Sequence, residues 1–170
     1  MTGFNIALPV PNELAEYAMR LSQQIASRHE TFFVLDNVNF FAHVTLCQLA
    51  KHDIKSIELT VQKIAAGTPI FTVTPTRFDS IYGWIGLGVA KTEAIVSLQE
   101  RIVKDCGLIS AEFKPHVTVT RMVKEEKASP VMAALEVYTK PVIFKSIGLY
   151  EMGEHGTCTK LLAELLLGVR

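Results

Sequence analysis

A four-residue pattern occurs twice in this chain, and the repeat limits the possible folds more than any other sequence feature. His43-Val44-Thr45-Leu46 recurs 73 residues later as His116-Val117-Thr118-Val119. The same offset of 73 residues places Ile70-Phe71 on Ile143-Phe144. A constant offset of this kind predicts an internal duplication of a strand-helix-strand-helix-strand unit, in which a pseudo-twofold axis relates the two copies.

The first copy carries local signals for each of its elements. Apolar periodicity predicts strands at 4–8, 42–49 and 70–78, and helices at about 12–27 and 54–66. Asn12 and Asp53 are the expected N-caps of the two helices. Because proline lacks an amide donor, Pro75 indicates an edge position or a bulge in the third strand.

The second copy follows the same order. Its strands are expected at 84–90, 115–121 and 142–151, and its helices at about 92–106 and 125–138. Pro130 suits the first turn of a helix, so the last helix could restart there. The leucine-rich tail, 158–169, fits either a helix or the return strand of a hairpin, and we favour the hairpin.

The size and charge of the chain restrict its class and its partners. It has 170 residues, 49% of them hydrophobic, which favours one well-packed domain spanning 1–170 and built from two lobes. Its formal net charge is zero. Binding to duplex DNA depends on phosphate neutralisation, so a neutral chain is better suited to a small nucleotide or an RNA end.

The sequence also indicates where the protein works. Its three cysteines are odd in number and lack metal-ligand spacing, which favours a reducing, cytoplasmic setting. Residues 1–10 lack the basic segment and long apolar run of a signal peptide, and no apolar stretch is long enough to cross a bilayer. We therefore expect a cytoplasmic protein without a membrane partner.

Each copy of the motif offers the same pair of chemical groups. Side chains two apart in a strand share a face, so His43 lies beside Thr45 and His116 beside Thr118. Cys47 shares that face by the same alternation, although nothing marks it as a nucleophile. Imidazoles, with an ordinary pKa of about 6.5, can act as base and acid, while hydroxyls hold phosphate oxygens. The set predicts phosphodiester cleavage that needs neither a metal nor a cofactor.

A single His-x-Thr pattern has an ordinary explanation, because many strands carry one half-buried histidine. His155-Gly156-Thr157 is a third occurrence, and we treat it as a coincidence since it lies in a glycine-flanked turn. The other two occurrences share an apolar frame, a strand context and matching places in the repeat, which sets them apart.

Several residues near the motifs could contact a substrate, although each also has a structural explanation. Arg121 follows the second motif, and it could reach the cleft through a bulge or remain a surface cation. Phe41, Phe113 and Tyr150 could stack on a base at the rim of the cleft, whereas core packing is the usual role of such aromatic residues.

On these two motifs, the chain resembles the two-histidine (2H) phosphoesterase superfamily, which includes 2′-5′ RNA ligase-like and cyclic phosphodiesterase proteins. The resemblance rests on His43-Val44-Thr45-Leu46 and Pro115-His116-Val117-Thr118-Val119, with the duplicated layout and the closing hairpin. It implies a bilobal α+β fold, in which two mainly antiparallel sheets form a central cleft with helices packed outside. It also implies that the two histidines are catalytic, that Thr45 and Thr118 bind the phosphate, and that Arg121 could match a basic residue common after the second motif.

We therefore predict a monomeric, metal-independent phosphodiesterase that acts on a nucleoside or RNA 2′,3′-cyclic phosphate or a related 2′-5′ phosphodiester. One histidine activates water and the other protonates the leaving ribose oxygen, and the sequence does not assign the two roles. Two alternatives remain open. One is 2′-5′ ligation of RNA ends, which the neutral net charge disfavours, and the other is a non-catalytic module that binds a nucleotide or RNA.

Overall fold

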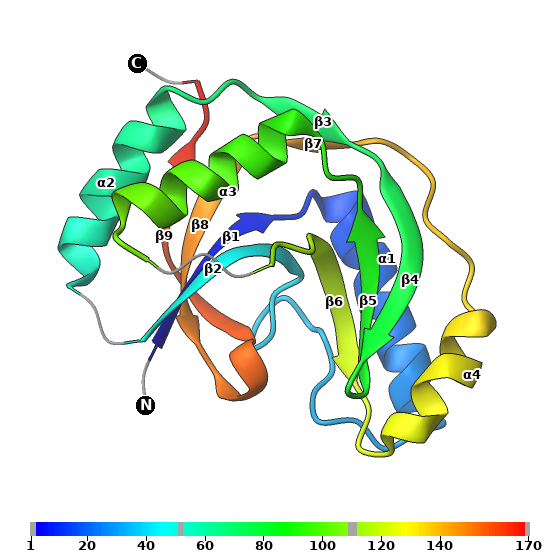
Figure 1. The fold of residues 1–170 in the computed structure, drawn as a ribbon. Coiled ribbons are helices and arrows are strands. Elements are labelled where there is room, and N and C mark those ends of the chain that lie inside the picture. The colour runs from blue at the N-terminus through cyan, green and yellow to red at the C-terminus, as the bar shows by residue number, and fades with distance from the viewer. Residues whose placement is uncertain (1–2, 51–52, 109–111, 169–170) are drawn as a thin grey trace.

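The computed structural model describes residues 3–50, 53–108 and 112–168 (Figure 1). Within these ranges, nine strands and four α-helices form an α+β fold, as predicted. The strands are β1 (Gly3–Pro9), β2 (His43–Ala50), β3 (Phe71–Val73), β4 (Pro75–Ile81), β5 (Trp84–Val89), β6 (His116–Arg121), β7 (Val142–Phe144), β8 (Ser146–Met152) and β9 (Cys158–Leu166). The helices are α1 (Asn12–Ala26), α2 (Ile54–Ala66), α3 (Glu93–Asp105) and α4 (Ala128–Ala133), and short 3₁₀ turns cover Glu125–Lys127 and Glu154–Gly156.

Seven of the strands form one antiparallel sheet in the order β4-β5-β6-β2-β1-β8-β9. The two motif strands, β6 and β2, are neighbours in this sheet, and one residue pair, Val44 with Val117, joins them. The strands β3 and β7 form a second small sheet, in which Phe71 pairs with Phe144. Both pairs join residues 73 positions apart, which supports the proposed internal repeat.

Helices of each copy of the repeat pack against strands of the other copy. α1 packs against β6 and α3 packs against β2, so each copy contributes a helix to the motif strand of the other. α2 lies beside α3, and α4 lies against β4 and β5 (Figure 1). A main core therefore draws on both copies. No helix in the described part of the chain is long and apolar enough to cross a membrane.

The helix starts show which predictions hold. Asn12 is not the N-cap of α1 but its first residue, because Pro11 takes the cap position and its carbonyl accepts the Ala15 N–H at 2.9 Å. Asp53 does cap α2, since its side chain accepts the Lys55 N–H at 3.1 Å. Local sequence identified both helices, and the cap of α1 lies one residue earlier than the sequence predicts.

Three predicted elements differ from the prediction, one helix by its length and two strands by a break. The helix expected over 125–138 ends at Ala133, and Tyr138 beyond it packs on Tyr17 of α1 with ring centroids 5.1 Å apart. The strands expected over 70–78 and 142–151 each split in two, because β3 and β7 pair with each other while β4 and β8 join the large sheet. Pro75 lies in the edge strand β4 beside a register shift, as predicted.

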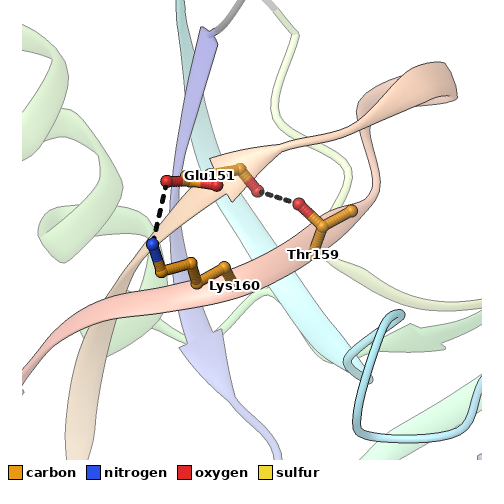
Figure 2. A network of polar contacts seen from close by, with 3 residues as sticks. All are labelled: Glu151, Thr159 and Lys160. Carbon is orange, nitrogen blue, oxygen red and sulfur yellow. Dashed lines mark hydrogen bonds and ion pairs between the residues drawn. The ribbon is translucent and has the colours of Figure 1, made fainter.

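The tail forms the predicted hairpin, in which β9 pairs along β8. Figure 2 shows polar contacts across it: Lys160 Nζ lies 3.4 Å from Glu151 Oε1, and Thr159 Oγ1 donates to the Glu151 carbonyl at 3.2 Å. An exposed ion pair of this kind contributes at most about 1 kcal/mol, so backbone pairing stabilises the hairpin. Its tip, Glu154–Gly156, extends to the face of the sheet that carries the motif histidines.

Candidate active site

Both motif histidines and both motif threonines line one pocket. The valines inside the motifs, Val44 and Val117, are fully buried, so strand alternation turns the four motif side chains to the opposite face. The pocket has a volume of about 540 Å³, which is within the range typical of small-molecule sites. Two segments far apart in the sequence thus meet at one cavity, where β2 and β6 lie side by side (Figure 1).

The same hydrogen bond orients both imidazole rings. Nδ1 of His43 lies 2.7 Å from the Phe41 carbonyl oxygen, and Nδ1 of His116 lies 2.7 Å from the Lys114 carbonyl oxygen. A carbonyl oxygen can only accept, so Nδ1 carries the proton in each ring. In the neutral form, each Nε2 therefore has a free lone pair with which to take a proton.

The loop before the first motif is held by one carboxylate. Asp36 accepts the backbone N–H groups of residues 38–40 at 2.7–2.9 Å and the side-chain amide of Asn39 at 2.8 Å. Burial alone raises the pKa of Asp36, but these hydrogen bonds outweigh it and lower the pKa to about 2. The charged form therefore persists at working pH and fixes the turn that presents the Phe41 carbonyl to His43.

The two imidazoles differ in exposure. His43 is only 6% exposed, whereas His116 is open to solvent. The pKa of His43 is lowered from its ordinary 6.5 to about 4, chiefly by burial. The hydrogen bond to Phe41 raises the pKa in part, and the charge of His116 adds to the lowering. At neutral pH His43 is therefore uncharged, and its Nε2 is an acceptor.

The low pKa of His43 makes the stability of the fold depend on pH. The unfolded chain takes up a proton on this residue near pH 6.5 and the folded chain only near pH 4, so acid favours unfolding between these values. We expect the free energy of unfolding to fall by about 3 kcal/mol from this source as the pH drops from 6.5 toward 4.

Urea unfolding at a series of pH values measures this dependence. The matched variant is His43→Asn, which does not titrate but whose amide can still donate to the Phe41 carbonyl. Its stability should fall less steeply over the same pH range. Equal slopes for the two proteins would contradict the lowered pKa.

A glycine makes room for the exposed ring. Gly86 pairs with Thr118 across β5 and β6, and a Cβ atom at this position would lie 2.8 Å from Cδ2 of His116. Atoms this close would force the imidazole to move. The missing side chain of Gly86 is therefore part of what sets the position of His116 in the pocket.

A register shift changes the face of the strand after the first motif. Ile6 pairs with Cys47 and Ala7 pairs with Thr45, so Leu46 is an extra residue opposite β1. The prediction that Cys47 shares the face of Thr45 is wrong, because such a bulge reverses the alternation. Gln48 lines the pocket instead.

Of the four residues predicted around the motifs, only Phe41 lines the pocket. Tyr150 is buried, with its ring centroid 6.3 Å from that of His43 and 5.8 Å from that of Phe41, so it supports both rings from behind. Phe113 packs against the main core. Arg121 is half-buried and does not line the pocket, but its side chain contacts His155, which does.

Several residues of the pocket wall were not predicted from the sequence. Three cations border it, Arg77 on β4, Lys91 after β5 and Lys114 before β6. A pairing of β5 with β6 would have indicated Lys91 and Lys114. Lys114 lies two residues before His116, and Lys91 follows the end of β5 that pairs with the start of β6. His155 also lines the pocket, from the tip of the hairpin. Within the described ranges, no three His, Cys, Asp or Glu side chains are grouped so that they could hold a metal ion.

Comparison with known proteins supplies the family context. A sequence model described as the 2′-5′ RNA ligase superfamily matches residues 10–156. The fold is similar to that of E. coli LigT solved with phosphate, at 16% identity and a TM-score of 0.67, covering 98% of this chain and 97% of that one. It is also similar to TT0787 of Thermus thermophilus, at 13% identity and a TM-score of 0.69, with 99% of each chain covered.

A third similar structure is the MHV ns2 PDE domain, at 15% identity and a TM-score of 0.55, covering 96% of this chain and all of that one. No curated protein sequence matches the chain. At these identities the structural matches establish the fold, and the family model establishes the sequence relationship.

Proposed function

This chain belongs to the 2′-5′ RNA ligase superfamily, and from that premise we propose that it is a metal-independent phosphodiesterase. Its substrate is a nucleoside or RNA 2′,3′-cyclic phosphate, or a related 2′-5′ phosphodiester. One observation carries the proposal: His43 and His116 line the same pocket, each with Nδ1 committed to a carbonyl and Nε2 left for proton transfer.

We base the two proton-transfer roles on the difference in burial. His43 is neutral, so its Nε2 takes a proton from the attacking water while the water oxygen bonds to phosphorus. The negative charge of the bound phosphate favours the protonated ring and so offsets part of the burial effect. His116 is open to solvent, and in its imidazolium form its Nε2–H gives a proton to the leaving ribose oxygen as the P–O bond breaks. Exchange with solvent then returns both rings to their starting forms.

Hydroxyls and cations stabilise the charge on the phosphate. Thr45 and Thr118 lie beside the histidines on the pocket wall, where their hydroxyls can donate to the non-bridging oxygens. Arg77, Lys91 and Lys114 outnumber the one carboxylate that the described residues place on the pocket wall, Asp79, and so favour an anionic substrate, although the chain as a whole is neutral. Lys114 also pairs with Glu112 at 3.2 Å, which weakens its contribution.

The similar structures are consistent with this chemistry. E. coli LigT was solved with phosphate and with 3′-AMP, and the ns2 domain is described as a PDE. The family name also keeps ligation of RNA ends as a second candidate, since ligation opens a cyclic phosphate with a 5′-hydroxyl in place of water. A non-catalytic nucleotide-binding module is the third candidate.

The test is incubation with the four nucleoside 2′,3′-cyclic phosphates and with 2′-5′-linked dinucleotides, in the presence of EDTA. We expect at least one substrate to be hydrolysed to a nucleoside 2′- or 3′-monophosphate at a rate that the chelator does not change. Binding without turnover would favour the module. Turnover that stops with EDTA would contradict metal independence, and joining of RNA ends without hydrolysis would favour the ligase.

A further inference from the structure

The pocket contains a third histidine that belongs to neither motif. His155 lies in the Glu154–Gly156 turn at the tip of the β8–β9 hairpin, and its backbone is left-handed, with φ at 57°. The side chain is half-buried and lines the pocket together with Trp84 and Gly156. A left-handed conformation is uncommon outside glycine, although histidine is one of the few other residues enriched there, so the turn suits this side chain.

The contact with Arg121 determines which nitrogen of His155 carries the proton. Arg121 Nη1 lies 3.0 Å from Nδ1 of His155. A guanidinium has donors and no acceptor, so Nδ1 must accept and must be unprotonated. The neutral ring therefore carries its proton on Nε2. This tautomer is the opposite of that of His43 and His116, whose protons are on Nδ1.

Aromatic contacts hold both partners in place. The ring centroid of His155 lies 4.6 Å from that of Phe32 and 6.5 Å from that of Trp84. The guanidinium carbon of Arg121 lies 5.0 Å from the Phe32 ring and 5.3 Å from the Trp84 ring, within cation–π range. A hydrogen bond also joins the turn to β1, because Asn5 Nδ2 donates to the Gly156 carbonyl at 2.9 Å.

We propose that His155 is a substrate-binding residue that donates a hydrogen bond from Nε2 to an acceptor atom of the nucleobase, with Arg121 as the residue that positions it. This inference rests on the proposed function. A neutral donor beside aromatic and apolar side chains suits an uncharged base edge better than a phosphate. The wall beside His155 is aromatic, because the ring centroid of Trp84 lies 5.9 Å from that of Phe33, which lies 5.6 Å from that of Phe40. The three cations lie on and around the ends of β4, β5 and β6.

The experiment measures how much the base contributes to catalysis. The probes are the nucleoside 2′,3′-cyclic phosphate that the wild type turns over best and 1-O-methylribose 2′,3′-cyclic phosphate, which lacks a base. The ratio of their kcat/KM values is the base factor. Loss of one hydrogen bond should lower this factor roughly three- to tenfold.

Two variants separate the hydrogen bond from the shape of the ring. His155→Asn tolerates the left-handed turn and removes the ring, while His155→Phe keeps an aromatic ring against Phe32 and removes both nitrogens. Both should lower the base factor. His29→Ala is the matched control, because His29 lies outside the pocket wall, and it should keep the wild-type factor.

Two results would overturn the inference. One is a wild-type base factor in His155→Phe, and the other is an NMR signature of His155 with its proton on Nδ1. Absence of turnover of both probes by the wild type would instead refute the proposed function, so the two failures are distinguishable. Thermal unfolding of each variant shows whether a lowered factor comes from a folded protein.

Discussion

His43→Ala and His116→Ala each lose nearly all turnover while the protein stays folded. In the proposed mechanism each ring performs one proton transfer, and a transfer of this kind contributes about 10²–10⁴-fold to the rate. The loss should appear in kcat, because the imidazoles act on atoms whose bonds change in the transition state. The two rings act in one step, so the double variant should be only slightly slower than either single variant.

Asparagine variants show whether Nε2 is the group that matters. His43→Asn and His116→Asn keep a donor for the Phe41 and Lys114 carbonyls but have no atom at the position of Nε2. They should be as slow as the alanine variants and closer to the wild type in stability. His29→Ala should keep the wild-type rate. If either alanine variant kept a rate near that of the wild type on every substrate, the two-histidine mechanism would be wrong.

Periodicity and repetition explain why much of this fold could be predicted. Alternation in β2 and β6 turns the motif histidines and threonines to one face, and the constant offset indicated that these strands occupy matching places. The helical spacing of Leu14, Ala18 and Leu21 likewise identified the buried face of α1. These features depend on residues close together in the sequence, which a single chain displays directly.

The remaining features of the site depend on contacts between distant segments. The bulge that moves Gln48 rather than Cys47 into the pocket comes from pairing with β1. His155 reaches the pocket only because the hairpin packs beside β1, and its partner Arg121 belongs to β6. The burial that makes His43 differ from His116 likewise arises from packing, since their sequence contexts are nearly identical.

Phe144→Ala should have the largest effect on stability among single substitutions away from the pocket. Phe144 is fully buried, and its ring centroid lies 5.7 Å from that of Phe71 in the small β3–β7 sheet. Removing a buried phenylalanine side chain typically costs about 3–5 kcal/mol, because apolar contact is lost and a cavity remains. A domain of this size is stable by only about 5–15 kcal/mol in total, so the variant should be marginal.

The position of Phe144 gives this loss a functional consequence. In the large sheet a single pair, Val44 with Val117, joins the strands that carry the two motif histidines. The copies are also joined there by β1 with β8 and by β4 with β5, and the β3–β7 sheet adds a further connection on which Phe144 lies. Denaturant unfolding measures the loss, and Ile143→Ala is the matched control, because Ile143 is the preceding residue and is 47% exposed. The control should lose less than about 1 kcal/mol. An equal loss of stability in the two variants would refute the assigned role of this packing.

Turnover measured against temperature shows the functional consequence. As temperature rises, turnover by Phe144→Ala should fall in step with its unfolded fraction.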